Sequence, residues 1–200
     1  VTGRPVDDTL HPLDPVLSES ERQRGREQLA AALGPAARAP GSLYLLHPGV
    51  EGDPRTWPAE RFGELAKRLI AGGARVLILT GPGEASIGQQ LESDIPGAAH
   101  LVGQRGLREL AGLFAAAAEQ EAKLFVSDSG PAHVAASVGL AVRLLAGPED
   151  PSRTGPWPLD ASGHHAVVGA DGEAGWSAPR PITEIRTEDA LLASGLLAVR

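Results

Sequence analysis

Residues 124–133 read Leu-Phe-Val-Ser-Asp-Ser-Gly-Pro-Ala-His, and a helix-like segment follows at residues 134–138. The apolar start of this stretch predicts a buried strand, and the Gly-Pro step predicts the first turn of a helix. A strand that feeds a helix in this way presents unpaired backbone N–H groups and the positive end of the helix dipole. The stretch therefore predicts a binding site for a phosphorylated ligand.

Apolar runs alternate with helical patterns on both sides of this stretch. The runs predict strands, and the apolar spacing between them predicts the intervening helices. The remaining predicted strands cover residues 43–46, 76–79, 100–102 and 141–145, and the helices cover residues 62–70, 84–91 and 107–115. Strands and helices that alternate at this interval predict an α/β fold with right-handed crossovers, namely a Rossmann-like, doubly wound parallel sheet.

The two ends of the chain differ from this repeating pattern. Residues 1–17 are rich in Pro and Asp and predict an extended linker, and residues 18–33 predict a helix capped by Ser18 or Ser20. Residues 147–182 are rich in Gly and Pro and show no clear element, which is typical of a functional loop or a surface wrap.

The last predicted element is an amphipathic helix over residues 187–197, with Thr187 as its cap. No internal repeat interrupts the order of elements, so one domain, alone or with an appendage, accounts for the length.

The composition limits the classes of function. The 200 residues hold 18 Lys and Arg against 25 Asp and Glu, a formal charge of −7, with no basic tract, so broad nucleic-acid binding is excluded. The absence of Cys excludes disulfides and thiolate metal sites. No apolar run approaches the roughly 20 residues that span a bilayer, so we expect a soluble, cytoplasmic chain. It starts at Val1 and contains no Met, which predicts a piece of a longer protein.

Small or turn-forming residues follow every predicted strand. They lie at residues 47–49, 80–84, 103, 127–133 and 147–148. In an open parallel sheet, ligands bind beyond the carboxyl ends of the strands, so these five segments predict one continuous rim, although each could also be an ordinary turn. The glycines after the second strand do not match the dinucleotide fingerprint, and no Walker Lys follows. A nicotinamide enzyme or a P-loop enzyme is therefore disfavoured.

Six motifs in a fixed order carry a resemblance to a known family. They are His47-Pro48-Gly49, Arg55-Thr56-Trp57-Pro58, Gly81-Pro82-Gly83-Glu84, Gly103 before Leu107-Arg108-Glu109-Leu110, Asp128-Ser129-Gly130-Pro131-Ala132-His133, and the run at residues 147–156. From about Leu43 onward the chain resembles the C-terminal half of the heptosyltransferases of glycosyltransferase family 9, which use ADP-heptose in lipopolysaccharide core assembly. The resemblance implies a GT-B architecture, with a linker and interdomain helix at residues 1–40, a donor-binding domain at residues 41–200, and an absent N-terminal acceptor domain.

The resemblance also implies roles for residues on the rim. The backbone N–H groups of Ser129 to Ala132 would bind the donor diphosphate without a metal. Glu84 would take the ribose hydroxyls, although it could instead be a favourable charge in the first turn of a helix. Asp128 would position sugar hydroxyls, although it could instead cap the following helix. His133 would reach a phosphate or a hydroxyl, although a structural role is equally open.

Further donor contacts are implied on neighbouring loops. Arg55 stands where the family usually has Lys and would neutralise the leaving diphosphate, or it could be a solvated surface charge. Gly103 would meet the adenine through its backbone, and Thr154 would approach the phosphates. Trp57 is expected to pack rather than to bind ligand. No metal or other cofactor is predicted, since the adjacent His164 and His165 lack a carboxylate at ligand spacing and the nucleotide-sugar is a substrate.

The expected reaction is inverting sugar transfer to a lipid-linked envelope glycan, with the general base supplied by the N-terminal domain. This chain alone would then bind donor without turnover, and the full-length protein would lie in the cytoplasm, peripheral at the inner membrane. Two alternatives stay open: a non-catalytic nucleotide-binding or interaction module, and another GT-B enzyme that uses a UDP-sugar. Ala146, where the family often has an aromatic residue, leaves the donor base open.

Overall fold

The computed structural model describes residues 15–103, 106–156, 164–170 and 176–196. Its centre is a six-stranded sheet of order β3-β2-β1-β4-β5-β6, in which every neighbouring pair is parallel. The strands are β1 (Leu43–His47), β2 (Arg75–Thr80), β3 (Ala99–Val102), β4 (Lys123–Ser127), β5 (Ala141–Leu145) and β6 (Ala166–Val168). This order confirms the predicted Rossmann-like, doubly wound fold and places the topological switch point between β1 and β4.

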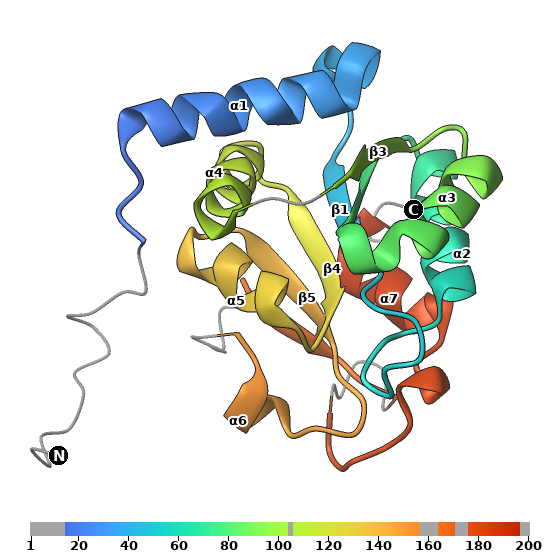
Figure 1. Ribbon diagram of the computed structural model, residues 1–200. Helices are drawn as coiled ribbons and strands as arrows, with labels where there is room; N and C mark the ends of the chain where they lie inside the picture. Colours follow the sequence, from blue (N-terminus) through green and yellow to red (C-terminus); the bar gives the residue numbers. More distant parts are fainter. Residues whose placement is uncertain (1–14, 104–105, 157–163, 171–175, 197–200) are drawn as a thin grey trace, which may run out of the picture.

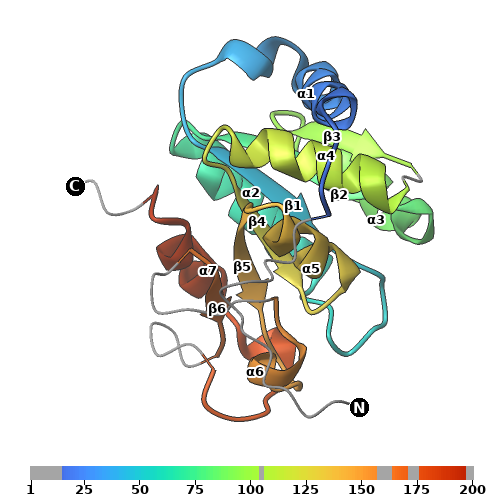
Figure 2. The same ribbon diagram turned by 90° about the vertical axis from the view of Figure 1, so that its left-hand side faces the viewer.

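Helices cover both faces of the sheet (Figures 1 and 2). One face packs against α4 (Leu107–Ala118) and α5 (Gly130–Ser137), and the other packs against α2 (Ala59–Ala71), α3 (Ala85–Asp94) and α7 (Thr187–Ser194). The remaining elements are α1 (Glu19–Leu33), the four-residue α6 (Pro151–Thr154), and three 3-10 turns, η1 (Gly34–Arg38), η2 (Pro82–Glu84) and η3 (Ile182–Glu184).

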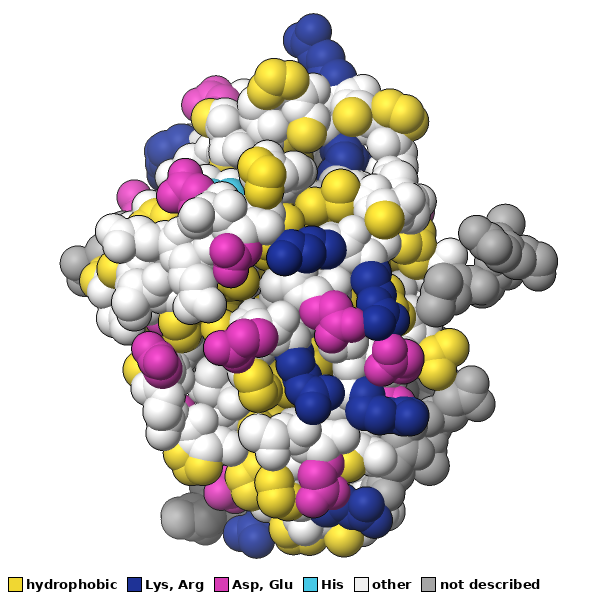
Figure 3. Space-filling model, turned by 90° about the vertical axis from the view of Figure 1, so that its right-hand side faces the viewer, with side chains coloured by type: hydrophobic (Ala, Val, Ile, Leu, Met, Phe, Trp, Pro, Cys, Tyr) yellow, Lys and Arg dark blue, Asp and Glu magenta, His cyan; other side chains and the backbone are white. Residues whose placement is uncertain are grey.

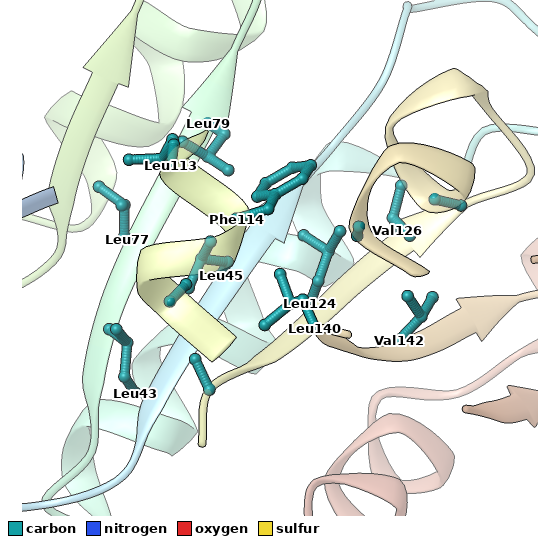
Figure 4. Packing of buried hydrophobic residues seen from close by; sticks show 14 of the residues in the cluster. Leu43, Leu45, Leu77, Leu79, Leu113, Phe114, Leu124, Val126, Leu140 and Val142 are labelled. Atoms are coloured by element: carbon teal, nitrogen blue, oxygen red, sulfur yellow. The ribbon is translucent and has the colours of Figure 1, made fainter. Parts of the chain in front are cut away.

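Alternate residues of each strand enter opposite halves of the core. Leu43 and Leu45 of β1 belong to the half of the core that faces α4 and α5, and Figure 4 shows Leu45 close to Phe114 of α4. Tyr44 and Leu46 point toward α2 and α7. Both sets are buried because a parallel sheet between two helical layers leaves neither face in water. This accounts for the continuous apolar runs that predict the strands.

Helix α1 lies across the outer side of α4 and forms an additional layer (Figures 1 and 2). It begins at a capping box, in which the side chain of Ser18 accepts from the backbone N–H of Glu21 and the Glu21 carboxylate accepts from the N–H of Ser18. Gly25 of α1 lies directly against Gly112 of α4, and a Cβ at Gly25 would lie 2.0 Å from the Gly112 carbonyl oxygen. The lack of two side chains thus sets how closely the helices approach.

Positively and negatively charged side chains are mixed on one side of the molecule. Figure 3 shows basic and acidic side chains interspersed on the side of the molecule where α2 and α3 lie. Arg68 of α2, for example, pairs with Glu64 and with Glu188 of α7. Within the part of the chain that the structure describes, no helix is both long and apolar enough to cross a bilayer.

Two expectations about the C-terminal part were wrong. Residues 147–182, expected to lack elements, contain α6 and the edge strand β6, which pairs with β5, and they end at the first residue of η3. A three-residue strand is too short to show a period of two, so its sequence carries no pattern. Thr187 is not the cap of α7: Arg186 holds that position, and the buried Thr187 hydroxyl donates to Glu64 Oε2 at 2.7 Å.

The structure refines the other boundaries. Helix α7 ends at Ser194 because Gly195 adopts a left-handed conformation with φ of 76°, whereas the expected end at Leu197 lies outside the described residues. Of the predicted linker, residues 1–14 also lie outside them. Ser18, rather than Ser20, caps α1.

Candidate functional site

The carboxyl ends of β1 and β4 lie side by side at the switch point of the sheet. His47, the last residue of β1, pairs in register with Val126, and the β4 chain continues through Ser127 into Asp128. The two crossovers leave this edge in opposite directions, so a crevice opens between the loops that follow the strands. Most of the predicted site residues lie on these loops and their neighbours.

The loop between β1 and α2 is held against β4 by Trp57. Its side chain is fully buried, packs edge-on against Phe62 at 5.0 Å between ring centroids, and donates from Nε1 to the Ile185 carbonyl at 2.9 Å. Its backbone N–H donates to Ser127 Oγ at 3.0 Å. Trp57 therefore packs, as expected, and fixes the loop that carries Arg55.

Arg55 lies at the rim of the crevice, about half exposed. Its guanidinium is held by Asp53 through Nε at 3.1 Å and Nη2 at 2.8 Å. The Asp53 carboxylate raises the pKa of Arg55, with smaller contributions from Asp128 and Glu149. Arg55, Asp128 and Thr154 line one cleft, so the structure brings together three of the predicted donor residues from separate loops.

The start of α5 presents fewer N–H groups than the sequence suggests. Pro131 has none, and the N–H of Ala132 donates to the Ser129 carbonyl at 3.0 Å. The N–H groups of Ser129 and Gly130 have no hydrogen-bond partner among the described residues. These two groups, with the helix dipole behind them, are the ones that can bind a phosphate.

Asp128 does not cap α5. Ser129 occupies the cap position, no side chain caps this helix end, and the Ser129 hydroxyl instead donates to the Ser127 carbonyl at 3.1 Å. Asp128 is partly buried and His133 is exposed on the first turns of α5. Helix capping, the alternative role for Asp128, is therefore ruled out. The ligand roles of Asp128 and His133 stay predictions.

Thr154 is held by α6, an element that sequence reasoning missed. The Asp150 carboxylate caps this short helix by accepting from the N–H of Ser152 at 2.9 Å, and the Thr154 hydroxyl donates to the Asp150 carbonyl at 3.2 Å. The turn therefore fixes Thr154 in the cleft it shares with Arg55 and Asp128.

A second hollow, of about 140 Å³, opens beyond β1 and β2 and is lined by His47, Gly81 and Gly103 among others. The buried carboxylate of Glu84 contacts two of these lining residues: Oε2 accepts from the N–H of Gly81 at 2.8 Å and lies 3.6 Å from His47 Nε2. Among the described residues, the buried His47 Nδ1 has no hydrogen-bond partner. Unpartnered polar atoms beside a hollow can receive the polar groups of a ligand.

His47 is a site residue that sequence reasoning did not single out. In the sequence it is only a part of the His-Pro-Gly motif. Its side chain becomes a candidate site group because it lies 3.6 Å from the carboxylate of Glu84, which is 37 residues further along the chain. No local signal predicts that contact, because the two strand ends meet only in the folded sheet.

The His47 imidazole predicts a pH dependence of stability. Burial lowers the pKa of His47 below its ordinary 6.5, and the charge of Glu84 offsets this only in part. The unfolded chain therefore binds a proton at this position more readily than the folded one, so His47 makes stability fall as pH drops below about 6.5. Urea unfolding between neutral and mildly acidic pH should show a weaker loss for His47→Gln than for the wild type. Parallel curves would contradict this assignment.

The two adjacent histidines lie away from the crevice. His165 is buried, and its Nδ1 accepts from the N–H of Val142 at 3.2 Å, while His164 Nε2 lies 3.0 Å from the Gly139 carbonyl oxygen. Across the described ranges, no cluster of three or more His, Cys, Asp or Glu could hold a metal ion. The absence of a metal requirement stays a prediction.

The family model for glycosyltransferase family 9 (heptosyltransferase) matches residues 4–168. The chain belongs to glycosyltransferase family 9. A comparison with curated protein sequences gave no significant match. The family assignment confirms the resemblance that the six ordered motifs predict.

Solved structures share the fold of this family 9 domain. E. coli ADP-heptose LPS heptosyltransferase II is 21% identical with a TM-score of 0.62, and the match covers 91% of this chain and 52% of that one. A family 9 glycosyltransferase from Veillonella parvula is 21% identical with a TM-score of 0.70, covering 91% and 53%. E. coli heptosyltransferase WaaC with ADP is 18% identical with a TM-score of 0.61, covering 78% and 45%. The chain thus spans about half the length of the structures it matches.

Proposed function

We propose that this family 9 domain is the donor-binding half of an inverting glycosyltransferase that takes ADP-heptose or a related nucleotide-sugar. The observation that carries the proposal is the buried Glu84 carboxylate, which is held against two residues that line the hollow, Gly81 and His47, while Gly103 lines the same hollow. A carboxylate in this setting accepts the hydroxyls of a ribose, while the backbone near Gly103 meets the base. The WaaC structure with ADP supports the choice of nucleotide.

The remaining groups are suited to the diphosphate and the sugar. The free N–H groups of Ser129 and Gly130 bind phosphate oxygens at the positive end of α5. Arg55 stabilises the charge that develops on the leaving diphosphate, and its guanidinium must share or leave Asp53 to do so. Asp128 positions the sugar hydroxyls from the same cleft. This set needs no metal to bind the phosphates.

The proposed reaction needs a partner half. In an inverting transfer, a general base removes the proton from the acceptor hydroxyl as that oxygen attacks the anomeric carbon and the nucleotide diphosphate leaves. We assign the base and the lipid-linked glycan acceptor to an N-terminal domain of the same protein. In this proposal the full-length enzyme works in the cytoplasm, at the inner membrane surface.

The test is a calorimetric titration with ADP and with 2′-deoxy-ADP. A charged hydrogen bond contributes about 1.5–3 kcal/mol, so Glu84→Gln should weaken ADP binding by about 10- to 100-fold. The same variant should lose most of the preference for ADP over 2′-deoxy-ADP, because Glu84 faces the ribose. Glu92→Gln, an exposed carboxylate on α3, is the matched control and should bind like the wild type.

The titration also separates the alternatives. UDP and GDP are compared with ADP in the same titration. Stronger binding of UDP than of ADP would indicate a UDP-sugar as the donor in place of an ADP-sugar. Binding that Glu84→Gln and Asp128→Ala leave unchanged would favour an interaction module over a donor site. A folded wild-type chain that binds none of the three nucleotides would overturn the proposal.

A further inference from the structure

One hollow on this domain lies at the opposite end of the strands from the donor crevice. It measures about 370 Å³ and is lined by Lys123, Arg143 and His164 with Glu121 and small residues. Lys123 begins β4, whose other end leads into Asp128, so the length of one five-residue strand, about 13 Å, separates this hollow from the crevice. The proposed donor site makes no use of it.

Two cations meet at this hollow, and backbone carbonyls are their hydrogen-bond acceptors. Lys123 Nζ donates to the Ser194 carbonyl at 2.6 Å. Arg143, which is 8% exposed, donates from Nε to the Ala193 carbonyl at 2.8 Å and from Nη1 to the His164 carbonyl at 2.8 Å. The carbonyls at the C-terminal end of α7 carry partial negative charge, which holds the two side chains in place.

No carboxylate neutralises this pair among the described residues. Glu121 lines the same hollow but forms no ion pair with either cation. Burial lowers the pKa of Lys123, and the neighbouring charge of Arg143 lowers it further. Burial also lowers the pKa of Arg143, and the nearby Tyr44 opposes this effect. Adjacent cations at low exposure are unfavourable unless an anion compensates them.

We propose that this hollow is a second ligand site, which binds a small oxyanion bearing a phosphate or carboxylate group between Lys123 and Arg143. The cations supply the charge, and the His164 imidazole forms part of the wall. Occupancy would tie the start of β4 and β5 to the end of α7. The proposal does not depend on the identity of the sugar donor.

The chain offers a direct probe, because it contains two lysines only, Lys67 and Lys123. Protein labelled with ¹³C at lysine Cε gives one NMR signal for each, and Lys67 is exposed on α2 as an internal control. Inorganic phosphate is titrated at constant ionic strength. We expect the Lys123 signal to shift saturably, with half-saturation in the millimolar range, while the Lys67 signal stays in place. Signals that stay still or move alike would overturn the proposal.

Variants locate the effect. Calorimetry should detect no saturable phosphate binding at this site in Lys123→Gln. Lys123→Arg keeps the charge and should retain the binding, which tests the site even where Lys123→Gln fails to fold. His133→Ala, on α5 at the other end of the sheet, should leave the Lys123 shift unchanged. A Lys123 shift that depends on His133 would assign the phosphate to the donor crevice and overturn the second site.

A second arm separates free anions from lipid headgroups. Vesicles of phosphatidylcholine with phosphatidylglycerol replace inorganic phosphate. A concave hollow favours a small soluble anion, so we expect free phosphate to shift the Lys123 signal and vesicles to leave it unchanged. A response to vesicles alone would overturn the soluble ligand. ADP binding is measured separately, so failure of this site and failure of the donor site are distinguishable.

Discussion

Trp57→Ala should lower the free energy of unfolding by about 3–5 kcal/mol, the usual loss for a large aromatic side chain removed from a core. The side chain is fully buried, packs against Phe62, and bonds to the Ile185 carbonyl, so its removal leaves a cavity and an unpaired acceptor. Urea denaturation measures the change. A loss below about 1 kcal/mol would mean that the loop repacks.

The same substitution should weaken nucleotide binding as well as stability. Trp57 fixes the loop to β4 through its N–H bond to Ser127, and Arg55 lies two residues earlier on that loop. Trp57→Phe is the control, because it keeps most of the packing and the backbone bond but loses the indole donor to Ile185. We expect an intermediate stability and near-normal ADP affinity for Trp57→Phe. If both variants bound ADP with equal affinity, the position of this loop would have no effect on donor binding.

Gly25→Ala should also destabilise the protein, by about 1–3 kcal/mol, as overpacking does. In an exposed helix, replacing Gly by Ala gains about 1 kcal/mol, so the sign of the effect is diagnostic. Here the new Cβ would lie 2.0 Å from the Gly112 carbonyl oxygen, which forces α1 away from α4. Urea denaturation, with hydrogen exchange of α1 amides, measures both the loss and its location.

Gly112→Ala tests the same crossing from the other side. Its Cβ would lie 2.9 Å from the Glu21 carbonyl oxygen, which is less severe, so the loss should be smaller than for Gly25→Ala. Ala30→Gly, on the exposed side of α1, is the control for helix propensity alone. A stabilised Gly25→Ala protein would show that α1 and α4 separate without cost.

The apolar runs predict the first five strands because a strand covered on both faces excludes polar residues. β3, expected at residues 100–102, is found at Ala99–Val102, and the helix start expected near Glu84 is found one residue later, at Ala85. The three-residue β6 and the four-residue α6 escape prediction because neither is long enough to repeat a pattern. The predicted cap of α7 is wrong because Thr187 is a typical capping residue by its local sequence, whereas its hydroxyl donates a hydrogen bond to Glu64 of a distant helix.

The features of the candidate site also divide into those that the sequence predicts and those that only the folded structure shows. The Asp-Ser-Gly-Pro stretch at the start of α5 is legible in the sequence, since a strand end, a Gly-Pro step and a helix start are consecutive in the chain. Which of its N–H groups stay free is decided by the turn geometry, which commits Ala132 to Ser129.

By itself the sequence determined the alternation of strands and helices, the order of the motifs and the family, because each depends on residues close together in the chain. Only the tertiary structure decided which side chains meet: His47 with Glu84, Arg55 with Asp128 and Thr154, and Lys123 with Arg143. The physical reason is the parallel sheet, which gathers strand ends separated by long crossovers at one edge. Contacts across such crossovers leave no periodic trace in the sequence.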